Sequence, residues 1–488
     1  MAILVVVDDL TEWPLHFEGV ETVAARDYLA QQQAWNGRRL TVFNLCRSWS
    51  YQSMGWYVSL LASARGHRPV PSVTHLRDIA SASLMRTVSH DLDELMQRSL
   101  ARLRGDHFEL SVYFGRNLAH AHDRLARALY NLFQVPFLRA TFERRRERWE
   151  LHAVTPIPAR SIARAHREFV IEAAKQYFAR YRPPRKRAAA PRHDLAILVD
   201  AEEASPPSDS RALARFQRAA EQLGMRAQVI HREDYGRLAE FDALFIRVTT
   251  AVNHYTYDFA RRAEALGLVV IDDPTSILRC TNKVFLAELL ERHEIEHPRS
   301  LLVNHENLAE VADQLGLPCV LKKPDSAFSQ GVVKADSLDE LISKGRELLA
   351  TSELVVAQEF LPTEFDWRVG VLDRKPLYVA RYHMAAKHWQ IIRRDDAGGE
   401  SYGRVQALAV DEAPRHVVRT AVRAANLIGD GLYGVDLKTT GRKCHVIEVN
   451  DNPSLDAGYE DSVLGARLYQ RVMEVFLQRI EARKSATH

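Results

Sequence analysis

One short stretch near the C-terminal end constrains the fold of this chain more than any other part. Residues 434–450 read GVDLKTTGRKCHVIEVN, two segments rich in apolar residues around a Gly-Arg pair. Such a pattern predicts a β-hairpin. If the strand pairing is centred on Arg442, Asp436 lies opposite Glu448. Asn450 then shares the face of Glu448, because side chains alternate along a strand.

Two carboxylates in such an arrangement need a compensating cation. Directly opposed side chains have Cβ atoms about 4.5–5.5 Å apart, and like charges at that separation destabilise a sheet. Ligand sets made of oxygen atoms suit Mg²⁺, which also keeps substrate phosphates in its shell. The hairpin therefore predicts a Mg²⁺ site at Asp436, Glu448 and Asn450. The alternative is an exposed polar face in another register that binds nothing, and the hairpin alone does not separate the two.

Two further segments carry weaker signals for a nucleotide. In residues 319–333 an apolar strand leads into Lys322, and a polar loop ending at Gly331 returns to a second strand. A lysine and a loop of small residues can hold phosphates with an ammonium group and backbone N–H groups. In residues 354–362 an apolar strand meets Gln-Glu-Phe-Leu-Pro, which can offer backbone groups to an adenine edge. An ordinary hairpin and an ordinary strand end remain the alternatives.

The clearest break in the chain is residues 182–192, where prolines, basic residues and alanines predict a solvated linker. Strands are predicted at 3–7, 39–45, 135–143 and 148–154 before this break, with a helix at 18–36. After it, we expect strands at 195–199, 227–230, 243–247 and 268–271 and helices at 211–223, 259–266 and 275–292. Alternating strands and helices predict a doubly wound parallel sheet. The turn at 47–57 is expected either to hold a carboxylate or phosphate or to pack the domain with its aromatic residues.

Composition excludes several classes of protein. The 488 residues suggest about three domains. Lys plus Arg number 66 and Asp plus Glu 63, a net charge of +3, so a nucleic-acid partner is not expected. Apolar stretches are too short for a membrane span or a signal peptide. The four cysteines form no CxxC pair, which fits a reducing compartment. We therefore expect a cytoplasmic protein with no membrane partner.

The order of these segments resembles the ATP-grasp superfamily, most closely its RimK-type ligases and glutathione synthetase. The resemblance covers residues 195–480 and includes the lysine and its loop, QEFL, DWR, VAR, GVD, IEVN and NPS. The stretch YQSMGWYVSLLASARGHRP is similar to the extra domain that precedes some RimK-like ATP-grasp proteins. The resemblance implies an α/β fold class with an ATP-grasp fold of two α+β lobes at 276–488. A doubly wound α/β domain would occupy 186–275 and an additional N-terminal α/β domain 1–185.

The resemblance also implies roles for individual residues. Mg²⁺, expected as two ions bridging the ATP phosphates, would be bound by Asp436, Glu448 and Asn450. ATP would contact Lys283, Lys322, Ser329, Gln330, Gly331, Glu359, Phe360 and Leu361. Arg368 and Arg381 would face the reacting carboxylate and the transferred phosphoryl group. The neighbouring Lys323 is an open alternative to Lys322.

The implied function is an ATP-dependent carboxylate–amine ligase that forms an amide or peptide bond through an acylphosphate and releases ADP and phosphate. A phosphotransferase acting on a hydroxyl and a non-catalytic nucleotide-binding scaffold are the alternatives. Amino acids, peptides or a protein tail are the expected substrates, and a homo-oligomer is the expected assembly. The sequence does not identify the carboxylate, the amine or the role of the N-terminal domain.

Overall fold

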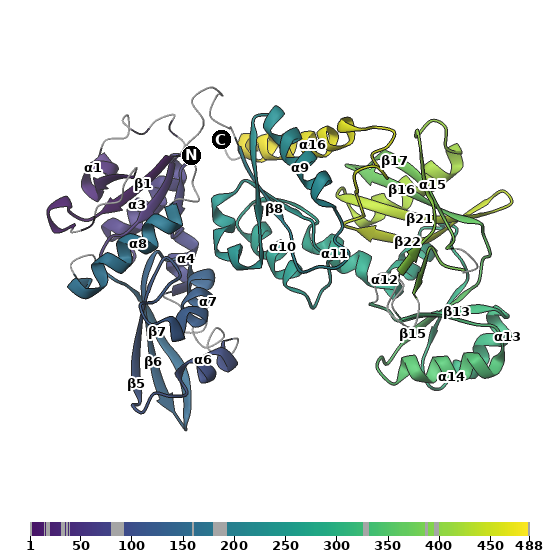
Figure 1. Ribbon diagram of the computed structural model, residues 1–488, viewed down its shortest axis with the longest axis horizontal. Helices are drawn as coiled ribbons and strands as arrows, with labels where there is room; N and C mark the ends of the chain where they lie inside the picture. The colour runs from purple at the N-terminus through teal and green to yellow at the C-terminus, as the bar shows by residue number, and fades with distance from the viewer. Residues whose placement is uncertain are drawn as a thin grey trace. The chain divides into compact units, whose positions relative to one another are not determined.

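The protein folds into two compact units. They are Met1–Pro191 with Glu233–Glu240, and Arg192–Arg232 with Phe241–His488; Figure 1 shows their elements. The computed structural model describes residues 2–13, 15, 20–30, 35, 38, 40–79, 92–158, 161–178, 193–325, 331–385, 389–394 and 400–486. The predicted linker at 182–192 lies outside the described residues, and the division into three domains stays a prediction.

The first unit begins with a parallel sheet. Its strands, in spatial order, are β2 (Glu21–Ala24), β1 (Ala2–Val7), β3 (Leu40–Asn44) and β4 (Arg68–Val70). The strands predicted at 3–7 and 39–45 are confirmed. The helix predicted at 18–36 is wrong at its start, because β2 pairs with β1 there and α1 (Ala25–Ala30) follows. The β-branched pair Thr22-Val23 favours the extended conformation of this edge strand.

The turn after β3 is held by the chain's own charges. The backbone N–H of Arg47 donates to the Asp8 carboxylate at 2.6 Å, and Arg47 Nε lies 3.4 Å from it. Ser53 then caps α3 (Met54–Ala64). Trp49 and Trp56 are buried in the apolar core of this unit. The two tryptophans thus pack the domain, whereas Tyr51 and Tyr57 are exposed, and an anion site at this turn stays a prediction.

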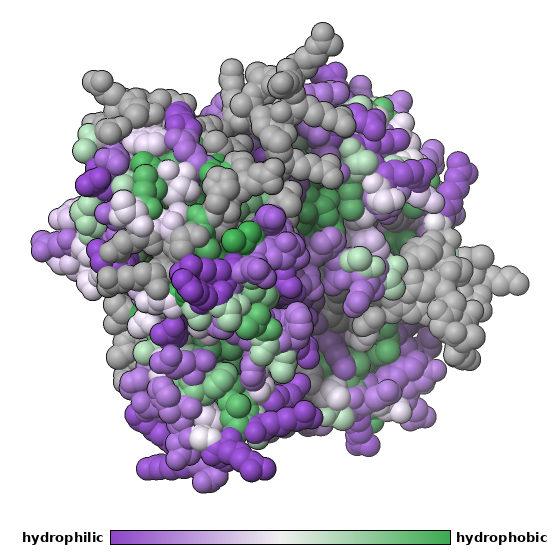
Figure 2. Space-filling view, turned by 60° about the vertical axis from the view of Figure 1, so that its left-hand side comes forward, coloured by the Kyte–Doolittle hydropathy of each residue, from purple (hydrophilic) through white to green (hydrophobic). Residues whose placement is uncertain are grey.

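The rest of the first unit is an antiparallel sheet with helices against it. The strands β5 (His107–Tyr113), β6 (Phe137–Arg145) and β7 (Arg148–Pro156) lie in chain order, which confirms the hairpin predicted at 135–154. The helices are α4 (Val73–Ile79), α6 (Asp93–Leu100), α7 (Asp123–Phe133) and α8 (Arg167–Phe178). On the face seen in Figure 2, hydrophobic side chains appear in small groups between hydrophilic ones.

The second unit opens with a doubly wound parallel sheet, as predicted. Its strands lie in the order β11 (Val269–Ile271), β10 (Ala243–Ile246), β8 (His193–Leu198) and β9 (Met225–Ile230). The helices α9 (Ser210–Gln222), α10 (Tyr255–Ala265) and the C-terminal α16 (Ala466–Ala486) belong to this part. Figure 1 shows α16 alongside α9. Phe216 of α9 and Phe476 of α16 contribute to one core with the sheet.

Two antiparallel sheets complete the second unit. The smaller has the order β12 (Ser300–Val303), β15 (Val355–Glu359), β13 (Cys319–Lys322) and β14 (Val332–Ala335), with α13 (Val311–Leu315) and α14 (Leu338–Leu349). The larger has the order β20 (Val405–Leu408), β17 (Lys375–His383), β16 (Phe365–Leu372), β21 (Leu432–Thr440) and β22 (Lys443–Asp451), with α15 (Arg415–Ile428). A separate pair is formed by β18 (Ile392–Arg394) and β19 (Glu400–Tyr402).

The helix predicted at 275–292 is two helices, α11 (Pro274–Thr281) and α12 (Lys283–Arg292). Asn282 separates them. Its side chain accepts a hydrogen bond from the Phe285 N–H at 2.9 Å, as expected for an asparagine that caps a helix. This break makes Lys283 the first residue of α12.

The four cysteines are buried and unpaired. Within the described part of the chain, the structure contains no helix with both the length and the apolar character needed to span a bilayer.

Candidate active site

The predicted hairpin is formed by β21 and β22. Asp436 is the register partner of Glu448, and Gly434 is the partner of Asn450. The predicted opposition of the two carboxylates is therefore confirmed. The pairing is not a simple reflection about Arg442, because the register shifts by one residue between Asp436 and Leu437.

The local cause of this shift is a bulge. Thr440 pairs with Lys443, so the turn has two residues, and Leu437 pairs with Val446. Ile447 is then the extra residue, and it restores the alignment of Asp436 with Glu448. Such an insertion leaves one residue unpaired and bends the strand.

A fork-shaped ion pair joins Asp436 to the neighbouring strand. Arg368 of β16 pairs with Asp436 in the sheet, and its Nε and Nη2 donate to Asp436 Oδ1 and Oδ2, each at 2.7 Å. Asn450 Nδ2 also donates to Asp436 Oδ2, at 3.1 Å. Burial alone would lower the pKa of Arg368, but the Asp436 carboxylate outweighs burial and raises this pKa above its ordinary value. The Arg368 guanidinium lies 4.8 Å from the centroid of the Tyr382 ring.

The second carboxylate has a lysine partner. Lys283 Nζ lies 3.0 Å from Glu448 Oε1. Burial would raise the pKa of Glu448, but the ammonium groups of Lys283 and Lys322 outweigh it and lower this pKa below its ordinary value. The start of α12 thus brings a cation to the face of the hairpin that carries the carboxylates.

Lys322 enters the same region from the smaller sheet. Its Nζ donates to Gln358 Oε1 at 2.7 Å. Burial, reinforced by the nearby charges of Lys283 and Lys438 and opposed by Glu448, lowers the pKa of Lys322 to about 8. When an anion binds here, the charged form of Lys322 is strongly favoured, because the negative charge of a phosphate offsets the neighbouring cations.

A pocket brings these elements together. Its lining includes Lys283, Lys322, Val356, Gln358, Val446 and Ile447. Among the described residues, no group of three or more His, Cys, Asp or Glu side chains is placed to hold a metal ion. The donor set of the hairpin is accordingly two carboxylates and an amide.

Comparisons with known proteins agree with this arrangement. The RimK-like ATP-grasp domain model matches residues 280–464, and the RimK-like ATP-grasp N-terminal domain model matches residues 25–173. The chain is 30% identical over 198 residues to the alpha-aminoadipate–LysW ligase LysX of Saccharolobus solfataricus, covering 39% of this chain and 68% of that protein. The chain belongs to the RimK-like ATP-grasp family.

Another relative and one solved structure extend the comparison. A probable alpha-L-glutamate ligase of Pseudoalteromonas atlantica is 26% identical over 262 residues, covering 51% of this chain and 80% of that protein. A crystal structure of D-alanine–D-alanine ligase from Bacillus anthracis aligns with 60% of this chain and 99% of that chain, at a TM-score of 0.47 and 16% identity.

The two arginines expected at the reaction centre of a RimK-like ATP-grasp protein do not lie together. Arg368 lies on the face of Asp436. Arg381 pairs in register with Trp367, on the opposite face of the sheet, and its guanidinium lies 4.7 Å from the Trp367 ring and 5.0 Å from the Phe365 ring. Trp367 belongs to the core that α15 covers. The expectation that both arginines face the phosphoryl group is therefore corrected for Arg381.

The three residues predicted to contact adenine do not line this pocket. Glu359 accepts hydrogen bonds from the Arg299 backbone N–H at 3.0 Å and from Arg299 Nε at 3.1 Å. Phe360 lies under Lys334, whose Nζ is 4.8 Å from the ring centroid. Neither Glu359, Phe360 nor the half-buried Leu361 is among the pocket-lining residues, so their contact with adenine stays a prediction.

Sequence reasoning included Gln358 in the predicted adenine segment but did not predict that its side chain lines the pocket and accepts a hydrogen bond from Lys322. The available signal was strand alternation, which places Gln358 on the same face as Val356, toward the pocket.

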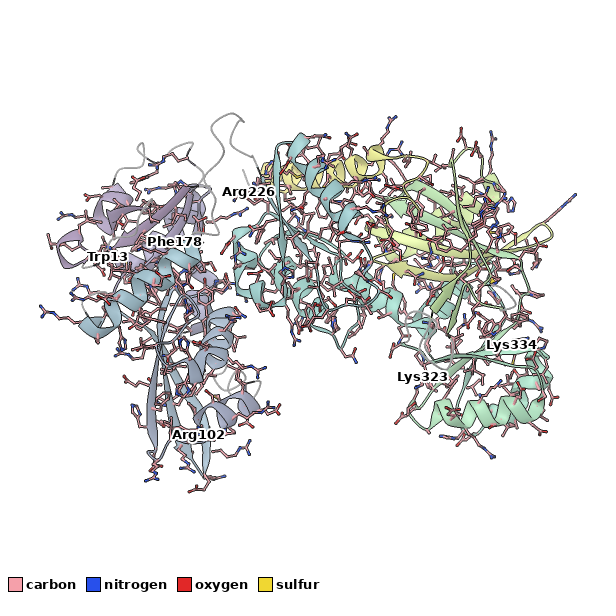
Figure 3. The ribbon with its side chains drawn as sticks, viewed as in Figure 1. Trp13, Arg102, Phe178, Arg226, Lys323 and Lys334 are labelled. Atoms are coloured by element: carbon pink, nitrogen blue, oxygen red, sulfur yellow. The ribbon has the colours of Figure 1, made fainter. Side chains whose placement is uncertain are left out.

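The predicted phosphate loop is described only at its end. Ser329 and Gln330 lie outside the described residues. Gly331 has φ +67°, a conformation that favours glycine, and its carbonyl accepts a hydrogen bond from the Lys323 N–H at 3.0 Å. A Cβ on Gly331 would lie 3.1 Å from Lys323 Cδ, so the Lys323 side chain lies beside this glycine. Figure 3 labels Lys323 and Lys334 in this part of the chain.

Proposed function

We propose that this protein is an ATP-dependent carboxylate–amine ligase that releases ADP and phosphate. The observation that carries the proposal is the alignment of Asp436 with Glu448 on one sheet face, together with cations from three other elements. Those cations are Arg368 of β16, Lys283 of α12 and Lys322 of β13. Membership of the RimK-like ATP-grasp family supports the same activity.

The donor set fits Mg²⁺. Two carboxylates and the amide of Asn450 supply oxygen ligands, which are the ligands that hard divalent cations take. Asp436, Glu448 and Asn450 would hold the ion, and the number of ions is left to experiment. Bound there, Mg²⁺ would neutralise negative charge on the ATP phosphates.

The surrounding cations would position the nucleotide. Lys283 and Lys322 are within reach of the pocket and would bind phosphate oxygens. Arg368 would present a planar guanidinium beside the transferred phosphoryl group, where preorganised donors stabilise the charge that develops. Because Arg368 is bonded twice to Asp436, its orientation is fixed before substrate arrives.

The chemistry requires activation because a free carboxylate has no usable leaving group. A substrate carboxylate oxygen attacks the γ-phosphorus of ATP, the bond from that phosphorus to the β,γ-bridging oxygen breaks, and ADP leaves. The resulting acylphosphate is attacked at its carbonyl carbon by an amine, phosphate leaves, and the nitrogen loses a proton. The chain's contribution is to orient the reactants and neutralise charge.

Amino acids or peptides, including a protein tail, are the substrates we propose. Names of relatives record alpha-aminoadipate and L-glutamate as groups that those proteins ligate. A homo-oligomer remains the proposed assembly.

The test is a pooled ligation in which the full chain, ATP and Mg²⁺ are incubated with mixtures of amino acids and peptides. Product masses and released ADP and phosphate are recorded, with Asp436→Asn as the matched control. Hydroxylamine in place of the amine should trap a hydroxamate with release of ADP. AMP and pyrophosphate would contradict the acylphosphate. A stable phosphate ester would indicate the phosphotransferase, and nucleotide binding without turnover in any pool would indicate the scaffold.

A further inference from the structure

An arginine outside the candidate site is buried far more deeply than its charge would suggest. Arg247 directly follows β10 and is 1% exposed. Its guanidinium donates to four neutral acceptors, which are Ser208 Oγ at 3.0 Å, Asn452 Oδ1 at 2.6 Å, the Pro207 carbonyl at 2.5 Å and the Pro453 carbonyl at 2.8 Å. Taking a guanidinium out of water is costly unless its donors are satisfied, so this burial is matched by an unusually complete set of acceptors.

Two residues that follow Arg247 also form hydrogen bonds with the segment at the end of β22 that contains Asn452. Asn452 Nδ2 donates to the Val248 carbonyl at 2.5 Å, and Thr250 Oγ1 donates to Asp451 Oδ2 at 2.6 Å. Asn452 has φ +45°, a left-handed conformation that asparagine tolerates better than most residues. The segment that follows β10, residues 247–250, therefore holds the last residue of β22, Asp451, and the two residues after it, Asn452 and Pro453.

The segment at the end of β22 packs directly on the candidate site. A Cβ on Gly434 would lie 2.8 Å from Pro453 Cβ and 3.7 Å from Arg368 Cδ, so the glycine leaves the space that Pro453 uses. Gly434 is the register partner of Asn450, and its carbonyl accepts from Asn450 Nδ2 at 3.4 Å. The position of Pro453 is thus coupled to the position of Asn450, which in turn bonds to Asp436.

We infer that Arg247 is a positioning residue for the metal-binding end of β22, supplied by the doubly wound sheet. It fixes Asn452 and Pro453, and through Pro453 and Gly434 it sets where Asn450 stands relative to Asp436. Arginine suits this task because one planar group offers five donors in a fixed geometry, whereas lysine offers a single point charge. The inference rests on the proposed function for the identity of the bound group.

The test compares three variants of the full chain. Arg247→Gln removes the guanidinium. Asn452→Gly removes both side-chain bonds of the loop asparagine while keeping a residue that accepts φ +45°. Arg226→Gln is the matched control, because Arg226 belongs to the same sheet, at the start of β9, and pairs with Asp194 at 2.6 Å (Figure 3 labels Arg226). In the part of the chain that the structure describes, Arg226 makes no hydrogen bond or ion pair to residues 451–453.

Three readouts separate positioning from simple loss of stability. They are the affinity for Mg²⁺·ADP by calorimetry, amide hydrogen exchange in peptides covering residues 446–455, and the melting temperature. Mutation of residues that orient metal ligands without touching the metal typically lowers metal affinity by about 10–100-fold. We expect a loss of at least tenfold, with faster exchange at 446–455, for both Arg247→Gln and Asn452→Gly. Arg226→Gln should lower the melting temperature but leave the Mg²⁺·ADP affinity and the exchange of residues 446–455 unchanged.

Unchanged Mg²⁺·ADP affinity and exchange in folded Arg247→Gln, or in Asn452→Gly if the first variant does not fold, would overturn the inference. An equal loss of affinity in Arg226→Gln would also overturn it, because the effect would then be general destabilisation. If the wild-type chain binds no nucleotide, the proposed function fails, and the exchange of residues 446–455 still decides the role of Arg247.

Discussion

Replacing Lys322 by methionine should change how the stability of the ligand-free protein depends on pH. The pKa of Lys322 is lowered from 10.5 to about 8, first by burial. Because the folded-state pKa is the lower one, the unfolded chain binds an additional proton between these two values. The stability of the wild type should therefore rise with pH through this window, and the group should oppose folding at pH 7.

The magnitude follows from the same two values. A full shift of that size corresponds to about 3 kcal/mol at low pH, and to a gain of about 2 kcal/mol between pH 7 and pH 9.5. Lys322 is only half-buried, so solvent screening reduces the effect, and we expect a gain of about 1–2 kcal/mol. The methionine variant also loses the hydrogen bond to Gln358. The part of that bond that changes with the charge of Lys322 is already contained in its folded-state pKa, and the remaining part cancels in the comparison.

The assay is urea unfolding of the wild type, Lys322→Met and Lys323→Met at pH 7 and pH 9.5. The pH-dependent gain should disappear in Lys322→Met and persist in Lys323→Met, since other titrating groups are common to all three proteins. Parallel pH dependences in the wild type and Lys322→Met would refute the reasoning. Affinity for Mg²⁺·ADP should fall in Lys322→Met and change little in Lys323→Met. The reverse order would assign the nucleotide contact to Lys323.

Three further predictions concern the hairpin and its neighbours. Asp436→Asn and Glu448→Gln should each abolish Mg²⁺-dependent turnover, measured as phosphate release, with circular dichroism unchanged; wild-type rates in both would discard the metal site. Arg368→Gln should lower turnover by on the order of 10²-fold or more, as the loss of a positioned electrostatic donor does, with a smaller change in ATP affinity. Arg381→Ala should instead leave turnover within a few-fold of the wild type and lower the melting temperature, because its aromatic contacts lie on the opposite sheet face; a 10²-fold loss of turnover would restore its catalytic role.

The most informative part of the sequence was the alternation within residues 434–450. Alternation decides which side chains share a face. The opposition of Asp436 and Glu448 was predicted by centring the pairing on Arg442, and it holds because the bulge at Ile447 offsets the two-residue turn. The doubly wound sheet was also predictable, because each buried strand is followed by a helical pattern of ordinary length. Both predictions depend on local periodicity, which a single sequence carries.

Features that depend on pairing between distant segments were not predictable. The face occupied by Arg381 follows from its register with β16, and nothing in the residues around Arg381 specifies that register. The bond of Arg368 to Asp436 joins positions 68 residues apart. The role inferred for Arg247 had no sequence signal, since a lone arginine after a short apolar strand usually lies at the surface.

Local propensity also misled at two places. Residues 18–36 have helix-compatible composition, yet the register with β1 makes residues 21–24 an edge strand. The helical pattern of residues 275–292 has no obvious break, yet Asn282 caps a second helix there. In the second case the residue that interrupts the pattern is also the one that places Lys283 against Glu448.

The bulge at Ile447 bears on how such sites are recognised in other chains. With the two-residue turn alone, Glu448 would face Val435 and enter the apolar core, so the extra residue keeps the carboxylate beside Asp436. A chain with one residue fewer between the two acids would keep them opposite each other, with the same two-residue turn and no bulge. The number of residues separating the two acids therefore reports on the turn and the bulge rather than on the site. A search pattern that fixes this spacing will pass over proteins with the same pair of carboxylates.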